Sequence, residues 1–314
     1  MDTLLYLFAR TLVALVQALP LRVVARLGRG CGALAFWLDA RHRRVALKNL
    51  TLCFAAEKSP TELHALAQEN FKRLGENFAC ALKTAVMPAP AMLPHFVFTG
   101  AEKILAHESN AGPQSRIFAI GHFGNFELYA RFGEFVPVFK CATTYRGLRQ
   151  PGLNRLMQEL RARTGCRFFE RRTEAAALKT AMSDTGLLLG LLADQHAGMN
   201  GLRLPFLGHT CSTSAAPAVF ALRYGCPLHS SICFRTGLAR WEIEVGDEIP
   251  TVENGQPRSL EAIMTDVNRA FETAIRRDPA NWFWVHNRWK PERMRVQNPE
   301  VRIQEPEGKA DDAV

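Results

Sequence analysis

The fold of this chain is decided by the stretch RIFAIGHFGNFEL, residues 116–128, in which an apolar, β-rich run ends on a histidine. Residues 116–120 have the length and composition of a short strand. Two glycines then free the backbone for a turn around His122, and Asn125 can cap a helix that carries Glu127 in its first turns. A histidine in this place is suited to chemistry, because open α/β sheets bind ligands beyond the carboxyl ends of their strands.

Short β-rich runs like this one alternate with helical stretches over most of the chain. Such alternation predicts an α/β fold with a mainly parallel central sheet that is covered by helices. Residues 187–193, LLLGLLA, lack polar alternation, so we expect them to form a strand at the centre of that sheet. Residues 240–248 alternate cleanly and follow a glycine turn, which indicates an antiparallel strand at the edge. The other expected strands cover 136–142, 166–169 and 228–234, and the expected helices lie at about 60–86, 126–133, 150–164, 173–184, 212–224 and 259–277.

The chain divides into three expected segments, with no repeats and no flexible linker. Residues 1–50 are an apolar and basic helical segment that we expect to associate with a membrane. Residues 51–297 are expected to form one catalytic domain, because no repeat or flexible linker divides them, and the chain's hydrophobic content of 47% is ample for a core. Residues 298–314 are polar and lack periodicity, so we expect a disordered tail.

The first helix is expected to lie in a membrane interface. Residues 3–19 are strongly apolar, but Arg10 and Gln17 interrupt them and leave fewer than the roughly 20 clean residues that a membrane span needs. Arg10 and Gln17 are seven residues apart, so they share one face of a helix and leave a broad apolar surface for the bilayer. The alternative is a buried first helix of a soluble domain. The basic residues that follow favour an anionic cytoplasmic leaflet: Arg22, Arg26, Arg29, Arg41, Arg43, Arg44 and Lys48.

The formal net charge of +9 implies an anionic partner. Arginine is concentrated between residues 146 and 172, a stretch that contains eight arginines and only two glutamates. Nucleic acid is not expected as the partner, because the sequence has no base-reading or stacking motif. The eight cysteines are scattered without C-x-x-C pairs or zinc-site spacing, so we expect reduced thiols in the cytosol and no metal site.

The spacing H-x4-[DE] occurs at His122 with Glu127 and again at His64 with Glu69. With nine histidines and 30 acidic residues in the chain, about one such match is expected by chance, so spacing alone is weak evidence. His64 and Glu69 lie inside a long amphipathic helix, where residues five apart point in different directions. His122 instead follows a strand and precedes a flexible turn, which allows its ring to meet Glu127. We therefore expect His122 and Glu127 to be the catalytic pair.

A histidine held by a carboxylate can act as a general base. The carboxylate fixes the tautomer of the imidazole, so that Nε2 can remove a proton from a hydroxyl near neutral pH. The sequence contains no G-x-S-x-G nucleophile motif and no P-loop. The histidine would therefore activate a hydroxyl of the substrate itself. A thioester donor would need little acid assistance in that reaction, because thiolate is a tolerable leaving group.

Four blocks of this sequence resemble, in their usual order, the bacterial lipid A biosynthesis acyltransferases within the wider group of H-x4-[DE] glycerolipid acyltransferases. The blocks are GHFGNFEL at 121–128, TYRGLRQPGLNRLMQELRARTG at 144–165, LLADQHAGMNGLRLPFLGHTCSTSAAPAVFALRYGCPL at 191–228 and NWFWVHNRWKPE at 281–292. Together with the apolar N-terminus, the resemblance covers nearly the whole chain. It implies a glycerolipid acyltransferase-like fold in which 51–297 is the acyltransferase domain.

The resemblance implies roles for the residues of the first block. His122 would deprotonate an acceptor hydroxyl, and Glu127 would orient His122. Asn125, which lies between them, is counted with the substrate-binding residues.

The other substrate-binding positions implied by the resemblance lie in the later blocks. Arg146, beside Tyr145, would hold the phosphate of the acceptor or the developing oxyanion. Asp194 and Gln195 match an Asp-Gln pair of the family, with a positioning role. Arg288 matches a family arginine, for which a structural ion pair and a ligand contact are equally expected.

The resemblance implies transfer of a fatty acyl chain from acyl carrier protein or acyl-CoA to a hydroxyl of a lipid A precursor, at the cytoplasmic face of the inner membrane. The implied partners are acyl carrier protein, a phosphorylated glycolipid and the anionic membrane, and no cofactor is implied. Phe126 replaces a commoner tryptophan and Asn287 stands where a basic residue is frequent. Another glycolipid, aminolipid or glycerolipid therefore remains open as the acceptor. A lipid-binding or transfer protein without turnover is the alternative from another class.

Overall fold

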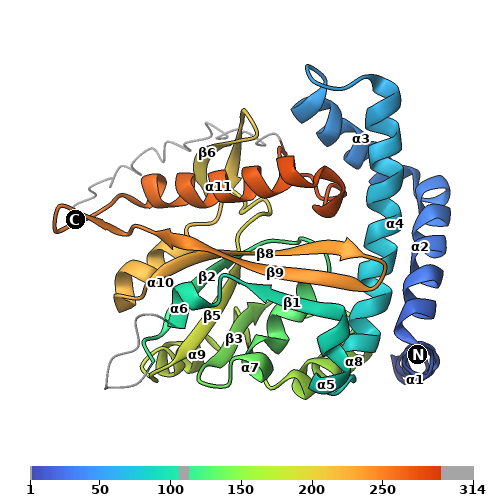
Figure 1. Ribbon diagram of the computed structural model, residues 1–314, viewed down its shortest axis with the longest axis horizontal. Helices are drawn as coiled ribbons and strands as arrows, with labels where there is room; N and C mark the ends of the chain where they lie inside the picture. Colours follow the sequence, from blue (N-terminus) through green and yellow to red (C-terminus); the bar gives the residue numbers. More distant parts are fainter. Residues whose placement is uncertain (1, 106–112, 291–314) are drawn as a thin grey trace, which may run out of the picture.

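A seven-stranded sheet forms the centre of the computed structural model, which describes residues 2–105 and 113–290 (Figure 1). Its order is β1-β9-β8-β2-β5-β3-β4, and every neighbouring pair is parallel except β8 with β9. The expected mainly parallel sheet is thus confirmed, and the apolar run at 187–193 supplies its interior strand β5. The strands are β1 Phe96–Thr99, β2 Arg116–Ile120, β3 Lys140–Tyr145, β4 Arg167–Glu170, β5 Leu187–Leu192, β8 Leu228–Gly237 and β9 Arg240–Ile249.

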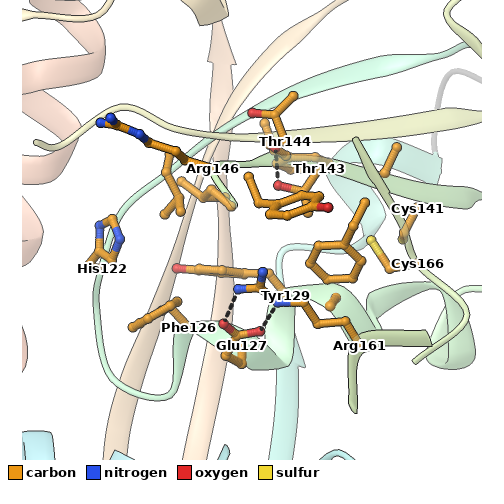
Figure 2. A pocket seen from close by; sticks show the side chains of 18 of the residues that line it. His122, Phe126, Glu127, Tyr129, Cys141, Thr143, Thr144, Arg146, Arg161 and Cys166 are labelled. Atoms are coloured by element: carbon orange, nitrogen blue, oxygen red, sulfur yellow. Dashed lines mark hydrogen bonds and ion pairs between the residues drawn. The ribbon is translucent and has the colours of Figure 1, made fainter. Parts of the chain in front are cut away.

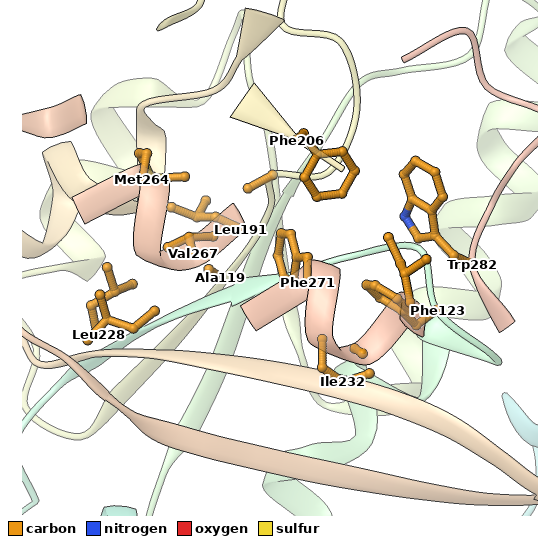
Figure 3. Close-up of a cluster of buried hydrophobic side chains, with 14 of the residues drawn as sticks. Ala119, Phe123, Leu191, Phe206, Leu228, Ile232, Met264, Val267, Phe271 and Trp282 are labelled. Atoms are coloured by element: carbon orange, nitrogen blue, oxygen red, sulfur yellow. The ribbon is translucent and has the colours of Figure 1, made fainter. Parts of the chain in front are cut away.

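The two faces of the sheet pack against different groups of side chains. Successive side chains of a strand point to opposite faces. On β2, Ile117 and Ala119 belong to the largest hydrophobic core, which also contains Val267 and Phe271 of the long helix α11 (Figure 3). Phe118 on the other face belongs to a separate apolar cluster that also contains Phe132 of the short helix α7, Phe132–Phe135. One face therefore carries the main core, and the other is free to line a cavity.

Helices cover the sheet and continue beyond it at the N-terminal end of the chain. Helix α4 is the longest, and a reciprocal pair of hydrogen bonds between Ser59 and Glu62 caps its start, as the sequence predicts. Helix α2 lies along α4 (Figure 1). The helices of seven residues or more are α1 Asp2–Ala18, α2 Leu21–Leu38, α3 Ala40–Phe54, α4 Pro60–Thr84, α8 Pro151–Arg161, α9 Ala175–Ala181, α10 Ala216–Tyr224 and α11 Leu260–Arg277. The shorter helical turns are α5 Ala89–Met92, η1 Leu93–His95, α6 Glu102–Leu105, η2 Phe126–Arg131, α7 Phe132–Phe135, η3 Ala162–Thr164 and η4 Pro279–Asn281.

Helix α1 turns its polar residues toward the protein. Arg10 forms an ion pair of 3.0 Å with Glu159 of α8, and the Gln17 amide donates to the Leu82 carbonyl oxygen at 3.0 Å. The expected shared face of Arg10 and Gln17 is therefore confirmed. The opposite face exposes a row of large apolar side chains, among them Leu4, Phe8, Leu12 and Leu15.

Membrane association of the N-terminal helices stays a prediction. None of the helices within residues 2–105 and 113–290 combines the length and the hydropathy that a membrane span requires. The expected boundary at residue 50 falls inside α3, and the proposed division into domains stays a prediction as well. The tail expected at 298–314 lies outside the described residues.

The strand expected at the edge of the sheet does not lie there. Residues 240–248 form β9, which pairs antiparallel with β8 as expected, but β1 covers its outer side in parallel register. No strand was expected at Phe96–Thr99, where β1 lies. The strand expected at 136–142 begins at Lys140, because Pro137 lacks the N–H that a strand needs.

Two expected helices also differ from the structure. The helix expected at 126–133 is a 3₁₀ helix, η2, followed by the single turn α7. The helix expected at 212–224 begins at Ala216, because the residues before it form β7, His209–Thr213, in a hairpin with β6, Leu202–Phe206.

Candidate active site

His122 lies just beyond the carboxyl end of β2, next to the end of β5. The two strands are parallel, and Ile120 is paired with Leu192. The residues two positions further along, His122 and Asp194, are therefore neighbours across the ends of the two strands. Nδ1 of His122 lies 2.8 Å from Oδ1 of Asp194, and the backbone N–H of His122 donates to Oδ2 at 2.9 Å.

Glycine is required on both sides of His122. A Cβ at Gly121 would lie 2.6 Å from the Phe123 ring and 3.3 Å from the Asp194 carboxyl carbon, so a side chain there would push the carboxylate away. Gly124 has φ +50°, and a Cβ on it would lie 2.5 Å from the Cys233 carbonyl oxygen. The turn expected from these glycines is confirmed, and it brings the His122 backbone against Asp194.

Asp194 is a buried carboxylate that is fully engaged. Besides the two hydrogen bonds from His122, its Oδ2 accepts one from the Trp282 indole N–H at 2.9 Å. Burial by itself would raise the pKa of Asp194, but His122 and the three hydrogen bonds lower this pKa to about 2. Asp194 is therefore ionised at neutral pH.

The charge of Asp194 determines that Nδ1 of the His122 ring carries a hydrogen. An ionised carboxylate can only accept hydrogen bonds, so Nδ1 of His122 carries a hydrogen, and in the neutral form of the ring Nε2 carries the lone pair. Nε2 lies 3.4 Å from the side-chain amide nitrogen of Gln195. The rings of Phe126 and Phe283 pack against the imidazole with centroid distances of 4.8 and 5.6 Å. Held in this way, His122 presents a basic nitrogen in a defined direction.

The expected hydrogen bond between His122 and Glu127 is wrong. Nδ1 of His122 is taken by Asp194, and the Glu127 carboxylate forms an ion pair with Arg161, the last residue of α8, at 2.8 Å. Figure 2 shows both Glu127 oxygens directed at the Arg161 guanidinium, away from the His122 ring. The physical reason is local: residues 126–131 form a 3₁₀ helix that turns Glu127 toward α8.

A cavity of about 830 Å³ opens beside His122. Its mouth has polar and basic side chains, among them Arg146, Arg171 and Gln195. The remainder is mostly apolar, and β2 and β5 contribute Phe118, Ile120, Leu188 and Leu192 from the sheet face opposite the main core. In Figure 2 the cavity extends from His122 toward Cys141 and Cys166. Such a site can hold a long apolar chain with its polar end at the histidine.

Several predicted binding residues do line this cavity. Tyr145 and Arg146 lie at the end of β3, and Gln195 follows β5. Arg146 is exposed and has no ion pair with any residue of the described part of the chain. In Figure 2 it lies across the cavity from Phe126 and Glu127. It is therefore free to bind an anionic group in front of His122.

Two predicted binding residues are buried in the protein and do not line the cavity. Asn125 is buried and does not line the cavity, and its side chain does not cap the following helix, contrary to expectation. Arg288 is also buried, and it donates to the carbonyl oxygens of Gln195 and Ser212 and to the Thr213 hydroxyl. Because these partners are protein groups beside Asp194, Arg288 supports the loop after β5.

The segment formed by residues 280–286 supplies site residues that were not predicted from the sequence. Trp282 donates to Asp194, and Nε2 of His286 accepts the His196 backbone N–H at 3.0 Å. Burial lowers the pKa of His286 to about 4, although the nearby Asp194 acts in the opposite direction. Both residues belong to the block NWFWVHNRW, so the resemblance contained a signal for them.

Two asparagines hold this segment against the N-terminal helices. Asn49 of α3 donates to the carbonyl oxygens of Trp284 and His286, at 2.9 and 2.7 Å. Asn70 of α4 donates to the carbonyl oxygens on either side of Asn281, at 2.9 and 2.6 Å. Helices α3 and α4 are therefore connected, through this segment and the Trp282–Asp194 hydrogen bond, to the strand ends that carry the site.

The chemistry open to this site is proton transfer by a histidine beside a lipid-sized cavity. No group of three or more potential metal ligands is found within residues 2–105 and 113–290. The eight cysteines are unpaired, and burial raises the pKa of the two in the cavity wall, that of the Cys141 thiol to about 12 and that of Cys166 further. A thiol with so high a pKa is a poor nucleophile.

Comparison with known proteins matches residues 2–291 to the family described as bacterial lipid A biosynthesis acyltransferase. The lipid A biosynthesis palmitoleoyltransferase of Escherichia coli (strain K12) is 25% identical over 281 residues, which cover 87% of this chain and 86% of the relative. The lipid A biosynthesis acyltransferase of Shigella flexneri matches with the same identity and coverage.

Proposed function

This chain belongs to the bacterial lipid A biosynthesis acyltransferases, and we propose that it transfers a fatty acyl chain from an acyl thioester to a hydroxyl of a lipid A precursor. Family membership confirms the resemblance that the four sequence blocks carry. One observation supports the proposed chemistry most directly. Nδ1 of His122 is fixed by Asp194, and His122 lines a cavity of lipid size.

In the proposed reaction, Nε2 of His122 takes the proton of the acceptor hydroxyl as its oxygen attacks the thioester carbonyl. The ionised Asp194 favours the imidazolium that forms, and it keeps the ring in the required tautomer. The tetrahedral intermediate then collapses: the new C–O bond stays, the C–S bond breaks, and the thiolate leaves. His122 returns its proton to the thiolate, so the enzyme ends unchanged.

Arg146 is the proposed partner of negative charge in this reaction. Its guanidinium lines the cavity mouth and has no ion pair within the described residues. A guanidinium of this kind can stabilise the oxyanion of the intermediate or bind a phosphate of the acceptor. Tyr145 and Gln195, which also line the mouth, would position the reacting groups.

The donor and the location are also part of the proposal. The apolar part of the cavity would hold the acyl chain of acyl carrier protein or acyl-CoA. The apolar face of α1, which is followed along the chain by exposed basic residues on α2 and α3, would lie against the cytoplasmic face of the inner membrane, where the acceptor would be found. Those basic residues are Arg22, Arg26, Arg41, Arg44 and Lys48.

The test is release of free thiol from acyl thioesters by the purified protein in detergent, with and without a lipid A precursor. His122→Ala should lower kcat at least about a hundredfold, because the general base is lost. His64→Ala is the matched control: His64 belongs to the second H-x4-E match but lies exposed on α4, so activity should be unchanged. Undiminished activity in a folded His122→Ala protein would reject the mechanism. Bound lipid without any thiol release would indicate the lipid-binding alternative.

A further inference from the structure

We propose that Glu127 is a positioning residue that acts through Arg161 on the acyl donor, by closing one wall of the cavity. This inference rests on the proposed function, since it concerns the chain that the cavity would hold. It assigns the acidic member of the H-x4-E spacing to donor binding and leaves the orientation of His122 to Asp194.

The ion pair of Glu127 and Arg161 is close and partly shielded from water. The Arg161 Nη2 atom lies 2.8 Å from one carboxylate oxygen of Glu127, and Nε lies 3.4 Å from the other. The two side chains line the cavity and are only 25% and 19% exposed. Such a two-point contact between a guanidinium and a carboxylate fixes the direction of both groups.

Aromatic rings hold the other side of the Arg161 guanidinium. Its central carbon lies 4.9 Å from the centroid of Phe168 on β4 and 5.7 Å from the centroid of Tyr145 on β3. Both distances are within the range of cation–π attraction. Through these contacts one arginine joins η2, the end of α8, β3 and β4 into a continuous cavity wall.

The place of this wall connects it to the donor. In Figure 2 the Glu127–Arg161 pair lies between His122 at one side and Cys141 and Cys166 at the other. An acyl chain with its thioester at His122 would run along the pair toward the apolar end of the cavity. The wall would therefore contact the chain, while the reacting carbonyl stays at His122.

If the ion pair forms the cavity wall, removing one charged partner should weaken donor binding more than removing both. Removal of one partner leaves a charge in a poorly hydrated place, which is strongly unfavourable, whereas replacement of both partners by apolar groups of similar volume is often tolerated. Loss of Glu127 would make Arg161 turn toward water and open the wall. Loss of both charges would leave an apolar wall, which a fatty chain can still contact.

The first experiment measures binding in a His122→Ala background, in which turnover is strongly reduced. Lauroyl-CoA, myristoyl-CoA and palmitoyl-CoA are titrated into Glu127→Met, Arg161→Met and the double variant. Each single variant should weaken binding by about tenfold, and the double variant should recover most of that loss. A double variant that binds no better than either single variant would overturn the inference. Because binding rather than catalysis is measured, this result is independent of the transferase activity.

The second experiment separates the wall from the base. In Glu127→Gln with His122 intact, KM for the donor should rise several-fold, while the pH at which kcat is half-maximal stays that of the wild type. A shifted pH midpoint with an unchanged donor KM would show that Glu127 acts on His122, and would overturn the inference. If the wild type transfers no acyl group at all, the proposed function fails, and the binding experiment still decides the role of the wall.

A second ion pair serves as the matched control. Arg258 and Asp266 are 2.8 Å apart with 18% and 26% exposure, nearly the values of the Arg161–Glu127 pair, but neither lines the cavity. Asp266→Asn should leave donor binding and KM unchanged. Equal losses in Asp266→Asn and Glu127→Gln would mean that the effect is one of general stability, and would overturn the inference.

Discussion

Asp194 binds His122 at two points, because its carboxylate accepts one hydrogen bond from the ring Nδ1 and another from the backbone N–H of the same residue. The contact fixes both the rotation of the ring and the position of its backbone. A third hydrogen bond, from Trp282, holds the carboxylate itself. The geometry required of a general base is therefore preorganised by buried groups.

Asp194→Asn should lower kcat by about 10²- to 10⁴-fold, because the neutral amide no longer stabilises the imidazolium and can hold the wrong tautomer. The measurement is steady-state thiol release, with circular dichroism to verify the fold. Asp247→Asn is the control, since Asp247 is highly exposed and lies outside the cavity. Retention of wild-type kcat in Asp194→Asn would contradict the role given to this carboxylate.

Asp194 should make the free energy of unfolding depend on pH in the acidic range. The pKa of Asp194 is about 2 in the folded protein, against an ordinary value of 3.8, so its ionised form is stabilised by folding. This contribution, about 2 kcal/mol, is present above pH 4 and is lost as the pH falls toward 2. The free energy of unfolding of the wild type should approach that of Asp194→Asn over this range. A difference between the two proteins that is constant from pH 6 to pH 2 would refute the assignment.

Trp282→Phe should destabilise the protein by about 1.5–3 kcal/mol, because it removes a hydrogen bond to a charged group while keeping an aromatic ring in the core. Trp284→Phe is the comparison: its indole donates to the neutral Pro279 carbonyl oxygen, so about 0.5–1.5 kcal/mol is expected. Urea denaturation measures both values. If both variants lose the same free energy of unfolding, the charge of Asp194 adds nothing to the Trp282 hydrogen bond.

The outward face of α1 should bind membranes. Leu4 and Phe8 are 72% and 63% exposed, and their joint replacement by Ser should remove most of the binding to anionic vesicles in a flotation assay. Val252→Ser changes a residue that is 53% exposed on β10, Val252–Glu253, and should have no effect. Unaltered flotation of the α1 variant would place the membrane contact elsewhere.

Several features of the fold follow from local periodicity and local backbone chemistry, and these could be predicted before the structure was known. The apolar run at 187–193 had to be an interior strand, and the polar residues of α1 had to share one face. The turn after β2 needed its glycines to place His122 at a strand end. These features depend on residues within a few positions of one another, which is why the sequence predicted them.

The carboxylate that binds the histidine could not be predicted from local sequence, because the packing of distant strands selects it. Glu127 is five positions away along the chain, but the 3₁₀ helix turns it toward Arg161. Asp194 is 72 residues away, yet β5 packs beside β2 in a register that brings the two strand ends together. Strand order and register are set by how whole strands and helices pack, and no spacing within a local motif encodes them.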